Sequence, residues 1–222
     1  MPPNASFHFD NQHLGIIFAV ITKHTLYMKK LFLSMIAVAS IATVGNAQVR
    51  FGGEVGVNMS NVMSSPSVST TMAIGARVGP IMDYAINDHF SIQPGIMFSM
   101  MGFKIDPVTE TINYIHIPIN VLYKFDVGPG KLFVGLNPYL GYALSGKVSG
   151  GGVSESITFG SNEGDTKALD FGIGGQVGYE LPMGLLFRVG YDYGFANLSN
   201  ESGETINNNC IHISVGYLFG SK

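Results

Sequence analysis

The chain has 222 residues, enough for one domain with a full core, yet only 12% of them are Asp, Glu, Lys or Arg, about half the usual share in soluble proteins. The formal net charge is -3, so the chain lacks the excess of Lys and Arg that nucleic-acid binding requires, and we expect no nucleic-acid partner. The single cysteine, Cys210, excludes an intramolecular disulfide.

A secretory signal peptide is expected to begin at Met28. Two lysines follow this methionine, then an apolar run from Leu31 to Val44, then small residues up to Ala47. A basic, an apolar and a small-residue region in this order are typical of such a peptide. The apolar run of about 14 residues is too short to span a membrane comfortably as a helix. With translation starting at Met1 or Met28 and cleavage after Ala47, the expected divisions are an upstream extension (1–27), a signal peptide (28–47) and a mature domain (48–222).

Eight segments of the mature chain alternate between large apolar residues and small or polar residues. Such a period of two is typical of a strand with two different faces. In the first segment, Val55 and Val57 share one face while Glu54 and Gly56 share the other. Each segment can supply roughly the 9–11 residues that a tilted membrane strand needs. The expected strands are 49–60, 72–84, 90–99, 114–125, 131–142, 169–181, 185–195 and 211–219.

The difference in size between the two faces indicates the environment of these strands. A soluble barrel would place its large apolar residues inside, and a soluble β-sandwich would show the same alternation. Here one face of every strand is large and apolar while the other mixes glycine with charge, which suits a narrow barrel whose outer face contacts lipid. Together with the signal peptide and the low charge, this predicts an all-β fold, an eight-stranded antiparallel up-and-down transmembrane β-barrel in the bacterial outer membrane.

The connections between these strands alternate in length. Outer-membrane barrels have long extracellular loops and short periplasmic turns, and an even strand number puts both termini in the periplasm. Besides outer-membrane lipid, we expect protein partners to contact the long loops, because loops carry most binding. The expected short turns are 85–89, 126–130 and 181–184, and the expected long loops are 61–71, 103–111, 146–166 and 197–209.

The inward face of the expected barrel carries a set of charged and amide side chains. Isolated buried charges are costly, so we expect these groups to pair and fill the interior. A lining that conducts small solutes, making the protein a narrow passive pore, is the alternative. The expected interior polar network is Glu54, Arg77, Asp83, Lys124, Asp170, Gln176, Glu180, Arg188 and Asp192, with Gln93 and Lys131 on the same face.

Aromatic residues gather near the ends of the outward faces. Their rings suit the boundary between lipid tails and headgroups. The expected girdle at the periplasmic boundary is Phe51, Tyr84, Phe90, Tyr123, Phe125, Tyr179, Phe187, Tyr217 and Phe219, and the opposite girdle is Phe98, Tyr142, Phe171, Tyr193 and Phe195.

Catalytic and metal-binding patterns are weak throughout the chain. His212 and Ser214 have the spacing of a hydrolase pair that would act on lipid, but the alternation points both inward and no orienting acid is assignable. His116 has no second ligand at metal-binding spacing and is interpreted as a wall residue. We therefore expect no catalytic residue, no metal and no cofactor, and a lipid-modifying enzyme is the least favoured alternative.

Several segments resemble PorT-type outer-membrane β-barrel proteins. The opening FGGEVGVNMSN (51–61) resembles the first strand of that family, and YIHIPINVLYKF (114–125) its central proline-containing strand. Residues 170–180 and 188–198 are similar to its later hairpin. The resemblance covers nearly all of residues 50–219 and implies an integral outer-membrane protein, with some members linked to protein secretion. The chain departs from the family where Phe219 is followed by Gly-Ser-Lys instead of ending on an aromatic residue.

Overall fold

A computed structural model describes residues 49–220. The expected upstream extension, signal peptide and cleavage after Ala47 lie outside these residues and stay predictions. Within residues 49–220, no helix is long and apolar enough to cross a membrane.

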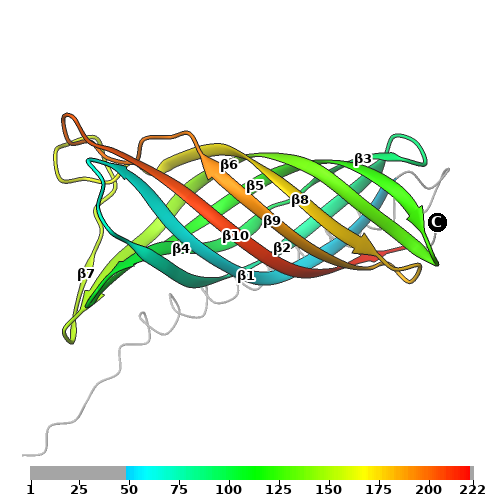
Figure 1. Cartoon of the computed structure of the whole chain (residues 1–222), viewed down its shortest axis with the longest axis horizontal. Coiled ribbons are helices and arrows are strands. Elements are labelled where there is room, and N and C mark those ends of the chain that lie inside the picture. The colour runs from blue at the N-terminus through cyan, green and yellow to red at the C-terminus, as the bar shows by residue number, and fades with distance from the viewer. Residues whose placement is uncertain (1–48, 221–222) are drawn as a thin grey trace, which may run out of the picture. The chain divides into compact units, whose positions relative to one another are not determined.

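Ten β-strands make up the described part of the chain (Figure 1). Their bounds are β1 (Val49–Ser65), β2 (Thr71–Ala85), β3 (Phe90–Pro94), β4 (Met97–Ile105), β5 (Val108–Val127), β6 (Gly130–Gly150), β7 (Val153–Ser156), β8 (Leu169–Glu180), β9 (Leu185–Gly194) and β10 (Thr205–Phe219).

One antiparallel ring closes from eight walls, where a wall is either one strand or, for β3 and β4, two strands in line. β3 and β4 together form the third wall, since both pair with β2 on one side and with β5 on the other. The ring continues through β6, β8, β9 and β10, and β10 returns to β1 along a register from Phe51↔Phe219 to Ser65↔Thr205. A closed ring has no open strand edge, which is what a lipid environment requires of backbone groups. The expected eight-stranded barrel is confirmed.

The third wall is interrupted at Gly95 and Ile96. Pro94 ends β3, because proline has no backbone N–H with which to continue the ladder. Two hydrogen bonds bridge the interruption: the Gly95 N–H donates to the Pro118 carbonyl at 3.0 Å, and the Ile96 N–H donates to the Pro80 carbonyl at 3.1 Å. The expected strand 90–99 is therefore one wall in two pieces.

The two ends of the barrel differ in their connections (Figure 1). At the end where β1 starts and β10 stops, here called the terminal end, short turns join β2 to β3, β5 to β6 and β8 to β9, as expected. The opposite end, here called the loop end, carries the two longest connections (157–168 and 195–204), the turns at 66–70 and 106–107, and the short hairpin of β6 and β7.

The four expected long loops are shorter than the sequence pattern indicates. β1 continues to Ser65 and β10 begins at Thr205. The expected loop 103–111 is a tight turn at 106–107 between β4 and β5, and β6 runs on to Gly150 before folding back as β7. These extensions lie outside the segments whose alternation predicted strands, and their sequences carry no sustained period of two.

The outer and inner faces follow the expected alternation. On β2, for example, Ile74 is 76% exposed while Arg77 is 3% exposed, and on β1 Val55 is exposed while Glu54 is buried. Apolar side chains therefore cover the outside of the ring, which is the surface that lipid contacts.

The interior is more apolar than the expected mixture of glycine and charge. Ile81, Met97, Leu186 and Leu218 form a buried cluster inside the ring. Phe133 is also inside, with its ring 5.7 Å from the Arg188 guanidinium carbon. These apolar side chains fill volume that the ion pairs leave between layers.

Candidate functional site

The interior polar network begins with four charged residues at the terminal end. Arg50 donates to Asp83 and to Glu180, each at 2.5 Å. Lys124 lies 3.0 Å from Asp83 and 3.1 Å from Glu180. Two cations and two carboxylates from four strands thus neutralise one another, which offsets the cost of burying them.

A second layer surrounds Glu54. The Arg188 Nη1 lies 3.1 Å from Glu54 Oε2, and Arg77 Nε lies 3.8 Å from Glu54 Oε1. The Ser214 hydroxyl donates to the same carboxylate at 2.9 Å, and Arg188 also donates to Gln93. The hydrogen bond from Arg188 on β9 to Gln93 on β3 carries this layer across the lumen between opposite sides of the ring.

The buried histidines lie beyond this layer. His212 Nε2 is 3.7 Å from Asp192 Oδ1, while Ser214 is engaged with Glu54 and not with His212. The His212 ring fits because Gly190 lies opposite it, where a Cβ would collide with the imidazole. The residues 49–220 contain no group of three His, Cys, Asp or Glu side chains arranged to hold a metal ion. The pair His212 and Ser214 thus lacks the contact that a nucleophile and its base require.

An apolar plug follows towards the loop end. Met101, Ile112, Tyr114, Ala143 and Cys210 form a buried cluster between the strands, and three residues of the following connection pack against it: Ile157, Phe159 and Ala168. The connection after β7 therefore folds inward over the barrel and does not extend away from it.

Two connections at the loop end are fastened into one unit, here called the cap (157–168 and 195–204). The Gly164 N–H donates to Glu201 Oε1 at 2.8 Å. Asn200 Nδ2 donates to the carbonyls of Gly160 and Asp165 at 3.0 and 2.9 Å. A β-bridge also pairs Thr166 with Ser199. The cap is thus held by side chains as well as backbone, although each connection alone lacks regular structure.

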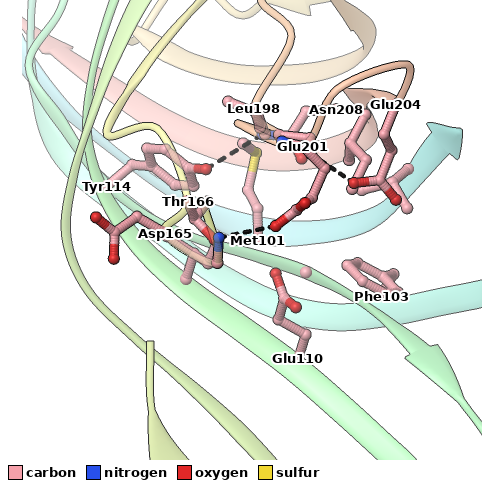
Figure 2. A pocket seen from close by; sticks show the side chains of 16 residues that line it. Met101, Phe103, Glu110, Tyr114, Asp165, Thr166, Leu198, Glu201, Glu204 and Asn208 are labelled. Carbon is pink, nitrogen blue, oxygen red and sulfur yellow. Dashed lines mark hydrogen bonds between the residues drawn. The ribbon is translucent and has the colours of Figure 1, made fainter. Parts of the chain in front are cut away.

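A cavity of about 160 Å³ lies between the cap and the strands, here called the mouth cavity (Figure 2). Its buried apolar floor includes Met101, Ile112 and Leu198. Figure 2 shows Glu110 rising from β5 on one wall, with residues of the cap on the other. The carboxylates that line it are Glu110, Asp165, Glu201 and Glu204.

Three of these four carboxylates already hold the cap together. Glu201 accepts from Gly164, Glu204 accepts from the Ser199 hydroxyl at 2.5 Å, and Asp165 accepts from Asn162 at 3.0 Å. Glu110 differs, since it has no hydrogen bond or ion pair with any residue from 49 to 220.

Glu110 lies near the start of β5, towards the loop end and beyond the position of the expected outer girdle. The expected outer girdle residue Phe98 pairs with Ile115, and Glu110 is five residues further towards the loop end, opposite Phe103. Burial raises the pKa of Glu110 above its ordinary value, because the charged form is the one that loses water. The charged form of Glu110 is therefore destabilised by burial, and a cation or hydrogen-bond donor that contacts it would stabilise that form.

The structure brings the expected interior residues together in successive layers. Asp170 accepts from Asn208 at 2.9 Å, and Gln176 donates to Asn120 at 2.8 Å. Lys131 lies instead at the rim of the terminal end, 2.6 Å from Asp126. The expected network left out several inward partners: Arg50, Asn58, Asn120 and Asn137, which the alternation places on the inward face, and Asn208, which lies in the expected loop 197–209.

The expected girdle residues lie on the outer face at the terminal end. Phe90, Tyr123 and Phe125 stack edge to face in a row, with centroids 4.7 Å apart in each pair. Tyr217 and Phe219 make a similar pair at 5.1 Å. Tyr179 donates its hydroxyl to the Val127 carbonyl at 2.7 Å, which ties one girdle ring to a turn.

An antiparallel ring with an apolar outside and an ion-paired inside defines the class of small membrane β-barrels. Residues 42–200 match the family model described as outer membrane protein beta-barrel domain. The chain belongs to this family and is an outer-membrane β-barrel protein. The comparison with curated proteins gave no match.

Solved structures of small outer-membrane barrels are similar to the chain. Neisserial surface protein A (NspA) is 17% identical, with 76% of this chain and 97% of that chain covered and a TM-score of 0.47. Ail, the attachment invasion locus protein of Yersinia pestis, is 13% identical, with 78% and 99% covered and a TM-score of 0.43. OprG of Pseudomonas aeruginosa is 13% identical, with 78% and 95% covered and a TM-score of 0.42. The family membership rests on the match to residues 42–200.

Proposed function

We propose that this outer-membrane barrel is a non-catalytic binding protein that acts at its loop end. The observation that carries the proposal is the cap, whose two connections are hydrogen-bonded to each other over a closed barrel and leave one side of the mouth cavity open to the outside. Three of the four carboxylates that line the cavity hold the cap together, whereas Glu110 does not and is left to meet a ligand.

The filled lumen supports a binding role over a passive pore. Ion pairs cross the lumen around Asp83, the Arg188–Gln93 hydrogen bond crosses it beside Glu54, and the apolar plug with Phe159 lies above them. A conducting path would have to separate several of these buried pairs, and leaving a charge unpaired in this environment is costly.

The proposal places both termini in the periplasm and the loop end outside the cell. It is supported by the short turns at the terminal end and the longer connections at the other, which is the arrangement typical of outer-membrane barrels. The resemblance of residues 114–125 to the PorT-type central strand supports a place in that branch of the family, with a role in secretion exercised through partner proteins.

Two measurements test the proposal. In planar bilayers, the folded mature chain should show no sustained conductance above that of lipid alone. In intact cells, a membrane-impermeant maleimide should label Ser161→Cys in the cap but not Met183→Cys in the terminal turn. Sustained conductance by protein that keeps its heat-modifiable gel mobility would contradict the binding role, and labelling of Met183→Cys alone would reverse the orientation.

A further inference from the structure

We propose that the mouth cavity binds an alkylammonium or alkylguanidinium group, which is a methylene stem that carries one cationic head. Free polyamines and the side chains of Lys and Arg share this chemistry. The inference rests on the proposed function and names the ligand class for the same site.

The floor of the mouth cavity suits the stem. Met101, Ile112 and Leu198 are each at most 6% exposed and present apolar surface to the cavity. Phe103 and Ile206 extend this surface along β4 and β10. Methylene stems of basic side chains bury readily against such surface while the head stays near polar groups.

The rim suits the cationic head. Four carboxylates line the mouth cavity, and its lining contains no Lys or Arg. Lys167, the nearest lysine in the cap sequence, already donates its ammonium group to the Ser199 carbonyl at 2.7 Å. The connections at the loop end, counted over 61–71, 103–111, 146–168 and 195–207, carry seven carboxylates and three lysines. This net negative charge attracts cations towards the mouth cavity before contact.

Glu110 is the carboxylate that the ligand would engage. The other three accept hydrogen bonds that hold the cap, whereas both oxygens of Glu110 are free of any partner among residues 49–220. It projects from β5, where pairing with Phe103 on β4 and Val148 on β6 fixes its backbone. A cationic head placed there would make a charge-assisted hydrogen bond with a carboxylate that is otherwise desolvated without compensation.

The size and chemistry of the mouth cavity exclude other cations. A cavity of about 160 Å³ admits a side chain or a small amine but no folded domain. A divalent metal ion needs several oxygen ligands preset around one point, and no such group of acidic residues occurs within residues 49–220. An apolar floor beside one free carboxylate therefore matches an alkyl cation better than a metal ion.

The test is calorimetric titration of the folded mature chain in detergent micelles with pentylamine, 1-pentanol and pentanoate. These probes share a five-carbon stem and differ in the charge of the head. Pentylamine should bind more tightly than 1-pentanol, and pentanoate should not bind. Equal binding of pentylamine and 1-pentanol, or binding of none of the three, overturns the inference.

Two variants locate the site. Glu110→Gln should weaken pentylamine binding about tenfold, the loss expected for one charge-assisted contact. Glu163→Gln is the matched control, since it removes the same charge from an exposed cap position that does not line the mouth cavity; its affinity should change less than about twofold. Equal losses in the two variants would mean general attraction by the cap and would overturn the site. Heat-modifiable gel mobility verifies that both variants are folded.

Two further probes identify the source of the ligand. Spermidine represents a free polyamine, and the peptide Gly-Gly-Lys-Gly-Gly, with blocked ends, represents a partner's lysine. Binding of either, weakened by Glu110→Gln, supports the inference, and the tighter probe names the source. Failure of every amine probe with a non-conducting barrel overturns this inference alone, whereas sustained conductance overturns the proposed function whatever the amines do.

Discussion

Glu201 on one connection of the cap accepts a hydrogen bond at 2.8 Å from the backbone N–H of Gly164 on the other. The two residues are 37 positions apart, and this bond is one of the few that join the connections directly. The cap therefore acts as a unit only while such links are intact.

Replacing Glu201 with Ala should loosen the cap without unfolding the barrel. The loss of one hydrogen bond to a charged acceptor costs about 1.5–3 kcal/mol where the bond is buried, and less at this exposed position. Limited proteolysis should cut the variant faster between residues 160 and 166, while its gel mobility stays that of a folded barrel. Glu163→Ala is the control, and equal cleavage of the two variants would show that the Gly164 bond does not hold the cap.

Replacing Arg188 with Leu should weaken folding more than it changes conductance. The change leaves Glu54 buried beside Arg77 at 3.8 Å without its closer partner, and removal of one member of a buried pair costs about 3–5 kcal/mol. Unfolding by guanidinium in lipid vesicles measures the loss. Lys131→Leu, at the exposed rim pair with Asp126, should cost less than about 1 kcal/mol. A conducting Arg188→Leu barrel of unchanged stability would argue that the lumen is a gated pore.

Gly190 and His212 should be energetically coupled. An Ala at position 190 would place its Cβ against the His212 ring, so Gly190→Ala alone should destabilise the barrel by about 1–3 kcal/mol. In a His212→Ala background the same change should cost clearly less, because the ring is gone. A double-mutant cycle of unfolding free energies measures the coupling, and additive effects would contradict the packing described.

The lipid A of cells with and without the protein should be identical. Ser214 donates to Glu54 and leaves His212 without a nucleophile, so the pair has no route to hydrolysis. Mass spectrometry of extracted lipid A checks this. A loss of acyl chains that depends on Ser214 would overturn the non-catalytic assignment.

Alternation along the strands was enough to predict the ring, because each wall residue faces either lipid or lumen and the chemistry of the two is opposite. The alternation of odd and even positions placed Glu54 and Arg188 inside correctly. It could not predict that Arg50 pairs with Asp83 and Glu180, because that pairing depends on the register between several strands. The cap was beyond sequence reasoning for the same reason. Its links, such as Asn200 to Gly160, join positions 40 residues apart that no local pattern relates.

The strand extensions escaped prediction for a different reason. Lys104 pairs with Thr109 in a regular ladder, yet Asp106 and Pro107 follow directly, and such a composition indicates a loop. Glu110 lies in this stretch. Its importance follows only from the mouth cavity that the cap encloses above it.

The seam between β1 and β10 joins the first and last described strands, with Phe51 opposite Phe219. Without β10, the remaining strands form an open sheet with two unpaired edges. The bilayer cannot hydrogen-bond such margins, so a chain interrupted before Thr205 has no partial state that the membrane tolerates. The pairing of β10 with β1 is thus the step that makes the ring compatible with the bilayer.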